Sequence, residues 1–246
     1  MTQTVLVTGA ASGLGNVIAG SLLEQGFQLV LTDVNAEHAQ RAAQQLDSGQ
    51  GRILALGLDI RQPQDFERAL AATCERFGSL QVLVNNAALT LATPVMDISP
   101  DEFDQVLTTN LRGTFVGCQT IGRYFAQRGY GRIINLTSLA GQNGGSGTGA
   151  HYAASKGGIL TLTKVFAREL SKSGVTVNAI APGPMDLPSV HALMPEEKLA
   201  AIINMIPVGK LGDAQFVAQA IALLASPQAE FVTGATWDIN GGLFMR

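Results

Sequence analysis

The sequence has few charged residues, and this scarcity limits the partners that the protein can bind. Asp, Glu, Lys and Arg make up 14% of the 246 residues, and the formal net charge is only −3. No run rich in Lys or Arg is present, whereas a nucleic-acid-binding protein generally carries a basic patch. We therefore expect a small-molecule substrate and no nucleic-acid partner.

Long apolar runs, cysteine motifs and histidine clusters are also missing. No stretch reaches the ~18 consecutive apolar residues typical of a membrane-spanning helix. The opening MTQTVLVTGAASG lacks the charged start and cleavage site of a signal peptide. Cys74 and Cys118 are far apart, so we expect reduced thiols in a cytoplasmic protein without membrane contact. The three histidines have no metal-ligand spacing, and no metal is expected.

Short β-rich segments alternate with amphipathic segments along the chain. Strand-like runs such as TVLVT (4–8), QLVLTD (28–33) and LQVLVNNAA (80–88) are separated by segments with helical periodicity. Such alternation predicts parallel strands joined by right-handed crossovers. The expected fold class is therefore α/β, a Rossmann-like, doubly wound parallel sheet of about seven strands with helices on both faces.

No internal repeat, low-complexity tail or linker divides the chain, which predicts a single dinucleotide-binding and catalytic domain over residues 1–246. Residues 182–207 are the most irregular segment and contain prolines at 182, 184, 188, 195 and 207. An excursion of this kind often forms a lid or a binding loop. We expect this segment to be the substrate-binding loop.

A glycine-rich turn follows the first predicted strand. Its pattern is G-x-x-x-G-x-G, with Gly9, Gly13 and Gly15 around Ser12 and Leu14. Glycines permit a tight turn and close backbone approach, and the following helix offers free N–H groups to a pyrophosphate. The position between the first strand and the first helix predicts a dinucleotide site. A plain strand-to-helix turn is the alternative interpretation.

Asp33 ends the second predicted strand. A carboxylate there can accept hydrogen bonds from both ribose hydroxyls of adenosine, and it would repel a 2′-phosphate. The next residues, Val34 and Asn35, are not basic, and Ser12 stands where a basic residue could have met that phosphate. These residues favour NAD over NADP. The alternative interpretation is that Asp33 is a simple turn residue with no role in cofactor binding.

Tyr152 and Lys156 are four residues apart in the segment GTGAHYAASKGG. On a helix, side chains at this spacing lie on the same face. The pair is compatible with a phenol and an ammonium held together for proton transfer, and equally with an ordinary solvated face. The rest of the chain decides between the two.

Together these motifs resemble the signatures of the short-chain dehydrogenase/reductase family, in its small single-domain type. The resemblance runs nearly end to end, and its further elements are Asn85-Asn86-Ala87, Asn110, Ser138, Pro182-Gly183 and the closing DINGG. It implies a hydride transfer between NAD and a secondary alcohol or ketone. It also implies a homotetramer.

The resemblance implies a role for each catalytic residue. Tyr152 would be the general acid/base, and Lys156 together with oxidised nicotinamide would lower its pKa from the usual ~10. Ser138 would hydrogen-bond the substrate oxygen. Asn110 would support a water that relays protons to Lys156. Gln142 is expected to contact the substrate together with Ser138 and Tyr152.

The expected cofactor contacts come from the ends of several strands. They are Gly9, Ser12, Gly13, Leu14, Gly15, Asp33, Asp59, Ile60, Asn86, Tyr152, Lys156, Pro182, Gly183 and Met185. The chain departs from the family pattern at Ala88, where glycine is common, and at Leu187, where many members have threonine. Leu187 cannot donate a side-chain hydrogen bond to the nicotinamide amide, so that contact is left to the backbone or to another residue.

The residues expected around the substrate are mostly apolar, and the loop carries no arginine to clamp a carboxylate or phosphate. A neutral, apolar secondary alcohol or ketone is therefore the main expectation. The alternative is an NADPH-dependent reductase that acts on 3-oxoacyl groups attached to a carrier protein. Asp33 and the scarcity of basic residues disfavour this alternative. A catalytically silent dinucleotide sensor is disfavoured by the complete set of Asn110, Ser138, Tyr152 and Lys156.

Replacing Asp33 by alanine should narrow the preference for NAD over NADP, because both the ribose acceptor and the repelling charge are removed. We expect the ratio of kcat/KM for the two cofactors to shift by roughly 10-fold or more, the worth of one charge-assisted hydrogen bond. Steady-state kinetics with each cofactor measure this ratio. An unchanged ratio would mean that the selectivity resides in other residues.

Overall fold

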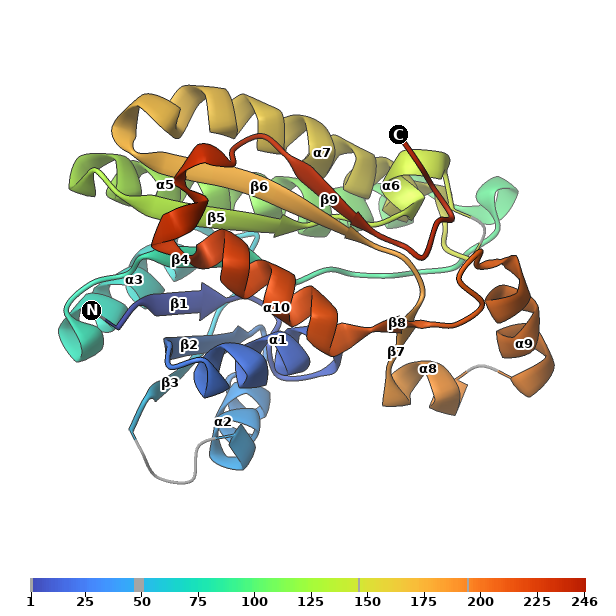
Figure 1. Ribbon diagram of the computed structural model, residues 1–246, viewed down its shortest axis with the longest axis horizontal. Coiled ribbons are helices and arrows are strands. Elements are labelled where there is room, and N and C mark those ends of the chain that lie inside the picture. Colours follow the sequence, from blue (N-terminus) through green and yellow to red (C-terminus); the bar gives the residue numbers. More distant parts are fainter. Residues whose placement is uncertain (1, 47–50, 146, 194) are drawn as a thin grey trace.

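A seven-stranded parallel sheet forms the centre of the protein (Figure 1). The computed structural model describes residues 2–46, 51–145, 147–193 and 195–246. The strands are β1 (Thr4–Val7), β2 (Gln28–Asp33), β3 (Ile53–Gly57), β4 (Val82–Asn85), β5 (Gly131–Leu136), β6 (Val175–Pro182) and β9 (Thr236–Ile239). Their order is β3-β2-β1-β4-β5-β6-β9, and every pair is parallel. The predicted doubly wound α/β fold is confirmed.

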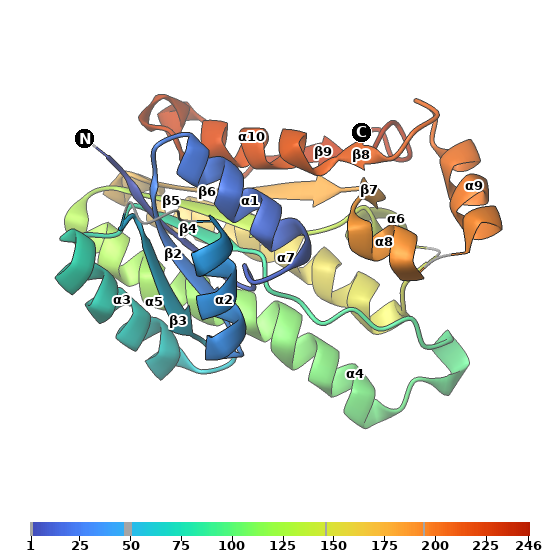
Figure 2. The same ribbon diagram turned by 90° about the horizontal axis from the view of Figure 1, so that it is seen from below.

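Helices cover both faces of this sheet, as Figure 2 shows from below. One face carries α1 (Gly13–Glu24), α2 (Ala36–Leu46) and α10 (Ala214–Ala225), and the other carries α3 (Pro63–Phe77), α5 (Gly113–Arg128) and α7 (Ala150–Leu170). Strands covered on both faces read as continuous apolar runs. In β1, Val5 and Val7 pack into one core and Leu6 into the other.

The strand order reverses direction between β1 and β4. The chain moves outward to β2 and β3 on one side, and to β5, β6 and β9 on the other. Connections therefore leave β1 and β4 on opposite faces, which opens a crevice at the carboxyl ends of these strands. This reversal places the glycine turn after β1 next to Asn86 after β4.

A long helical run begins at α4 (Pro100–Leu107), where the Ser99 Oγ accepts a hydrogen bond from the Glu102 N–H over 3.2 Å. It continues through η2, a π-helical turn (Thr108–Arg112), into α5. A π turn widens a helix locally and is frequent at functional sites. Here it carries the buried Asn110.

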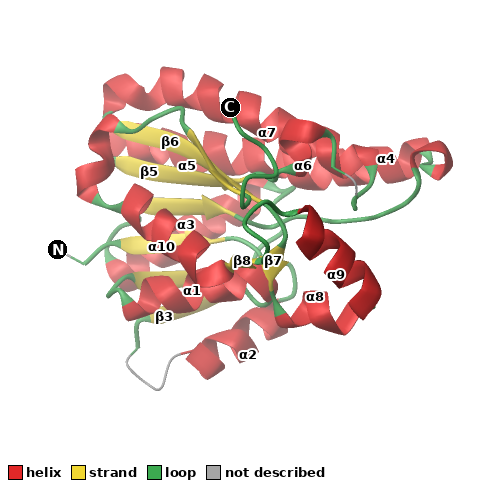
Figure 3. Cartoon of the chain, turned by 45° about the vertical axis from the view of Figure 1, so that its right-hand side comes forward, coloured by secondary structure: helices red, strands yellow, loops and turns green. Residues whose placement is uncertain are grey.

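The proline-rich segment 182–207 is more regular than its sequence indicated. It contains β7 (Met185–Asp186), which pairs with β8 (Gly212–Asp213), and the helices α8 (Pro188–Leu193) and α9 (Glu196–Met205). Pro188 is the first residue of α8 and Pro195 is the N-cap of α9, positions where the missing N–H costs little. Figure 3 shows both helices beside the carboxyl ends of the strands. Met194 lies outside the described residues.

Four shorter helices complete the described chain. They are η1 (Val95–Asp97), α6 (Ala140–Asn143), η3 (Ser171–Ser173) and η4 (Pro227–Phe231). Among the described residues, no helix combines the length and the apolar character needed to cross a membrane.

Phe66 of α3 is fully buried in the core beneath α5, whereas Phe231 of η4 is 99% exposed. Phe66→Ala should lower the free energy of unfolding by about 3–5 kcal/mol, because it leaves a cavity in a packed core. Phe231→Ala is the matched control and should change it by less than ~0.5 kcal/mol. Urea unfolding followed by circular dichroism measures both, and equal effects would contradict this packing.

Candidate active site

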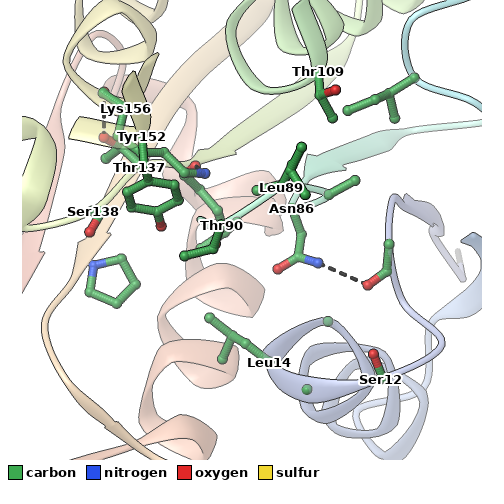
Figure 4. Close-up of a pocket in the computed structure, with 18 of the residues that line it drawn as sticks. Ser12, Leu14, Asn86, Leu89, Thr90, Thr109, Thr137, Ser138, Tyr152 and Lys156 are labelled. Atoms are coloured by element: carbon green, nitrogen blue, oxygen red, sulfur yellow. Dashed lines mark hydrogen bonds between the residues drawn. The ribbon is translucent and has the colours of Figure 1, made fainter. Parts of the chain in front are cut away.

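A cavity of about 790 Å³ opens at the carboxyl ends of β1, β2, β4, β5 and β6. Every residue expected to contact the cofactor lines it, from Gly9 to Met185, and Ser138 lines it too. Figure 4 shows Tyr152, Ser138 and Thr90 on one side of this space, Ser12 and Leu14 on the other, and Asn86 between them. The structure thus brings the predicted nucleotide turn and the predicted catalytic pair into one site.

The glycine turn is shaped to approach a ligand closely. Gly9 has a φ of 63°, a left-handed conformation that glycine adopts without strain. A Cβ at position 15 would overlap the carbonyl oxygen of Gly9, so this turn requires glycine at position 15. Ser12, the N-cap of α1, makes no side-chain capping bond, which leaves the first N–H groups of the helix to a ligand. These features fit a dinucleotide pyrophosphate.

Thr8 and Asn86 join the turn to the end of β4. The Thr8 Oγ1 accepts hydrogen bonds from the N–H groups of Asn86 and Ala87, over 3.0 and 3.1 Å. The Asn86 amide nitrogen donates to the carbonyl oxygens of Thr8 and Gly9, over 2.9 and 3.1 Å. The Asn86 side chain therefore supports the phosphate-binding turn as well as lining the cavity.

The adenosine end of the cavity holds Asp33, Asp59, Ile60 and Arg61. The Asp33 Oδ1 accepts a hydrogen bond from the N–H of Asn35, which orients the carboxylate. Arg61 donates through Nε and Nη2 to Asp59, with a shortest distance of 2.7 Å. These bonds hold the pKa of the Asp59 carboxyl below its usual value. The guanidinium of Arg61 is thus already paired within the site.

Tyr152 lies in the first turn of α7 with its phenol directed into the cavity (Figure 4). Burial raises the pKa of this phenol above its ordinary value, and hydrogen bonds with the hydroxyls of Ser138 and Thr90 act in the opposite direction. Ser138 follows β5, and its Oγ also accepts from the N–H of Ala140 over 3.1 Å. Two hydroxyl groups therefore converge on the phenol oxygen.

Lys156 lies one turn further along α7 and is 3% exposed. Its Nζ donates to the carbonyl oxygen of Leu136 over 2.7 Å and stands 5.7 Å from the centre of the Tyr152 ring. Burial lowers the pKa of the ammonium to about 8. The expected lowering of the Tyr152 pKa by this ammonium is not seen, because burial is the largest influence on the phenol and the opposing contributions come from the hydroxyls of Ser138 and Thr90.

Asn110 does not line the cavity but supports it from behind. Its side-chain oxygen accepts from the Leu89 N–H over 2.7 Å, and its nitrogen donates to the Leu89 carbonyl and the Ser155 Oγ. Both ends of the amide are therefore engaged by the protein, so the side chain serves the loop after β4. If Asn110 takes part in a proton relay, its main-chain carbonyl oxygen would have to do so, and this oxygen accepts a hydrogen bond from the Thr114 Oγ1.

Gln142, expected to bind substrate, is not among the cavity-lining residues. Its amide nitrogen donates to Asp238 Oδ1 over 2.6 Å, and Asp238 also pairs with Arg246. The side chain is thus turned toward the C-terminal segment. The position of Gln142 shortly after Ser138 in the sequence did not indicate this orientation, because its partner Asp238 lies 96 residues away along the chain.

Sequence reasoning missed several residues that line the cavity. They are Val34, Leu58, Arg61, Ala87, Leu89, Thr90, Thr109, Leu136, Thr137 and Val190. Thr90 is the most informative, because its hydroxyl reaches the phenol of Tyr152. Its place shortly after Asn85-Asn86, at a strand end next to the glycine turn, is the signal that could have identified it.

Comparisons with known proteins agree with this architecture. A family model described as enoyl-(acyl carrier protein) reductase matches residues 9–244. The 3-oxoacyl-(acyl-carrier-protein) reductase FabG of Vibrio cholerae is 37% identical over 244 residues, which cover 99% of this chain and 98% of that protein. The FabG protein of Escherichia coli is 36% identical with the same coverage. A crystal structure of a short chain dehydrogenase from Bacillus anthracis is similar, with a TM-score of 0.89, 31% identity, and 99% and 97% of the two chains covered.

The chain belongs to the short-chain dehydrogenase/reductase family. It is an oxidoreductase of that family and uses a nicotinamide cofactor. The resemblance drawn from the motifs is confirmed, and the residues that carried it meet in the cavity described above.

Lys156→Met should remove a pH dependence of stability that the wild type shows. Because the pKa of Lys156 is about 8 in the folded protein and ~10.4 in the unfolded chain, the unfolded chain holds more protons between these values. The free energy of unfolding therefore rises with pH in this window. We expect the wild type to gain on the order of 1–2 kcal/mol relative to the variant between pH 7.5 and 9.5.

Urea unfolding of both proteins at the two pH values measures this difference. The comparison isolates Lys156, because the remaining titratable groups are common to both chains. A difference that stays constant with pH would contradict a buried, desolvated ammonium at this position.

Proposed function

We propose that the protein reduces a 3-oxoacyl thioester to the 3-hydroxyacyl thioester. The observation that carries the proposal is full-length similarity, at 36–37% identity, to proteins named 3-oxoacyl-(acyl-carrier-protein) reductase. These relatives favour the carrier-linked alternative of the sequence analysis over its main expectation of a neutral alcohol or ketone.

Tyr152 can supply the proton that the reductive direction needs. A phenol of ordinary pKa, ~10, already holds its proton at neutral pH, and burial shifts the pKa of Tyr152 further in that direction. A protonated phenol can donate to the carbonyl oxygen of a ketone, whereas oxidation of an alcohol would need the phenolate as a base. The Ser138 and Thr90 hydroxyls stand beside the phenol and supply further hydrogen bonds where charge develops on the substrate oxygen.

The cavity supports a bound dinucleotide along its full length. The glycine turn and the start of α1 would hold the pyrophosphate, and Asn86, Pro182, Gly183 and Met185 would surround the nicotinamide half. A reduced nicotinamide bound there supplies the hydride. Lys156 reaches the same space from α7, where an ammonium can donate to ribose hydroxyls.

Within this proposal we infer NADH rather than NADPH as the reductant. Asp33 lines the adenosine end, where its negative charge opposes a 2′-phosphate. Arg61 is the cation that also lines this end, and its fork is engaged by Asp59. An arginine already paired in this way is less available to a phosphate.

The segment 182–207 is proposed to act as the substrate-binding loop. Leu187 and Val190 line the cavity, together with the buried Met185. This apolar border suits an acyl chain, and equally the neutral ketone of the second candidate function. The single-domain organisation over residues 1–246 and a cytoplasmic location are proposed with it.

A homotetramer is proposed from the faces of α4, α5 and α7. Apolar residues remain partly exposed there, including Phe115 (37%) and Val165 (42%). Between these helices runs a groove, lined by Leu107, Thr108, Leu111, Arg112, Phe115, Gly158, Thr161 and Leu162. A second copy of the chain could cover it, and light scattering of the purified protein measures the assembly.

Oxidation of NADH and NADPH should be followed with 3-oxoacyl thioesters of increasing chain length, on coenzyme A and on a carrier protein, beside cyclic and aromatic ketones. We expect thioester reduction with NADH, and loss of turnover by at least ~10³-fold in Tyr152→Phe, which keeps the ring and lacks the proton. The variant should still bind NADH. Turnover of the neutral ketones alone would overturn the proposal and favour the second candidate function.

A further inference from the structure

The first turn of α7 carries Tyr152 but begins without a capping side chain. Its N-cap is Gly149, and the first N–H groups of a helix have no partners within the helix. The Tyr152 N–H instead donates to the Nδ1 of the adjacent His151 over 2.8 Å. A Cβ at residue 149 would overlap the His151 ring, so the glycine leaves room for this imidazole.

The bonds around His151 define which of its nitrogens carries a proton. A backbone N–H can only donate, so Nδ1 in this arrangement accepts and carries no proton. Nε2 therefore bears the hydrogen and donates it to Glu102 Oε1 over 2.8 Å. The His151 side chain is fully buried, and these two partners account for both ring nitrogens.

Glu102 anchors this arrangement on a different helix. It lies in the first turn of α4, and its own N–H is capped by Ser99. Its carboxylate also accepts a hydrogen bond from Thr93, and Thr93 and His151 together hold the pKa of the carboxyl below its usual value. Its side chain is 25% exposed, so substitution there does not open the core.

The loop after β4 supplies a parallel connection to the same turn of α7. The Leu91 carbonyl accepts from the Gly149 N–H over 2.8 Å, and the neighbouring Thr90 hydroxyl bonds the phenol of Tyr152. Asn110 fixes this loop through both backbone groups of Leu89. The backbone of Tyr152 is therefore held by Glu102 and His151, and its side chain by Thr90 and Ser138.

We propose that Glu102 and His151 are positioning residues for Tyr152. Through the chain of bonds from Glu102 to His151 Nε2, and from His151 Nδ1 to the Tyr152 N–H, they set where the phenol stands relative to the reacting carbonyl. Neither residue lines the cavity, so they act on the rate of proton transfer and not on cofactor binding. The inference rests on the proposed function only in taking Tyr152 as the proton donor.

The test compares Glu102→Ala with Glu102→Gln, using the fastest substrate of the wild type. The glutamine keeps an oxygen that accepts from His151, whereas alanine removes it. We expect kcat to fall roughly 10-fold or more in Glu102→Ala, because small misplacements of a reacting group are costly. Glu102→Gln should retain at least about half of the wild-type kcat, and the dissociation constant for NADH should change less than about twofold in both.

Asp101→Ala is the matched control, because Asp101 lies in the same helical turn and is exposed. It removes the same charge from α4 and should leave kcat unchanged. A kcat for Glu102→Ala within about twofold of wild type would overturn the inference. So would equal losses in the glutamine and alanine variants, because these would indicate a charge effect and not a hydrogen bond.

His151→Ala completes a double-mutant cycle. If Glu102 acts through His151, the double variant should be no slower than His151→Ala alone, whereas additive losses would contradict the chain of bonds. Should His151→Ala fail to fold, the comparison of the two variants at the partly exposed Glu102 still decides. Tyr152→Phe, measured in parallel, separates the two levels. If Tyr152→Phe remains active, Tyr152 is not the proton donor and the proposed function loses that assignment. If Tyr152→Phe is inactive and Glu102→Ala is fully active, only the positioning role of Glu102 and His151 is overturned.

Discussion

The hydrogen bonds between Thr8 and Asn86 are the constraint on which both halves of the site depend. They join the ends of β1 and β4, where the strand order of the sheet reverses and where no regular ladder continues. On one side they fix the glycine turn that would hold a pyrophosphate. On the other they fix the start of the loop whose residues Leu89 to Thr93 reach α4, Asn110 and Tyr152. A shift at this junction would move the nucleotide and the proton donor relative to each other.

Buried polar groups account for much of the order around the site. Lys156 and His151 are almost or fully buried, and each has a defined hydrogen-bond partner. An unpartnered polar group in such a place would cost free energy, so these bonds select one arrangement of α7 against β5 and α4. The same burial raises the pKa of Tyr152 and lowers that of Lys156, because desolvation disfavours the charged form of each group. Stability and chemistry thus have a common physical origin in the desolvation of this region.

The predictions from sequence succeeded where local pattern and chemistry coincide. The alternation of β-rich and amphipathic segments predicted the parallel sheet, because the central strands β1, β4, β5 and β6 are buried and the helices that cover the sheet bury one face against it. Gly9, Gly13 and Gly15 predicted a tight turn, and the backbone found there requires glycine at these positions. The predictions from sequence were less complete for residues 182–207, where prolines begin helices. They were also incomplete for Gln142, whose partner Asp238 is distant in sequence. Arg61 was missed because neither its residue type nor its spacing sets it apart, whereas the position of Thr90 shortly after Asn85-Asn86 was a signal that the predictions did not use.

Local sequence patterns were enough to predict the fold class, the family and the set of residues that could hold a dinucleotide and move a proton. These follow from periodicity over short windows and from motifs whose spacing is fixed by a turn or a helix. Which of these groups already have hydrogen-bond partners within the protein became evident only from the three-dimensional arrangement. Asn110 supports Leu89, Gln142 bonds Asp238, Arg61 pairs with Asp59, and His151 connects Glu102 to the backbone of Tyr152. Except for the short pairing of Arg61, each of these engagements needs a partner from another element, and burial and proximity across the fold are not encoded in local spacing.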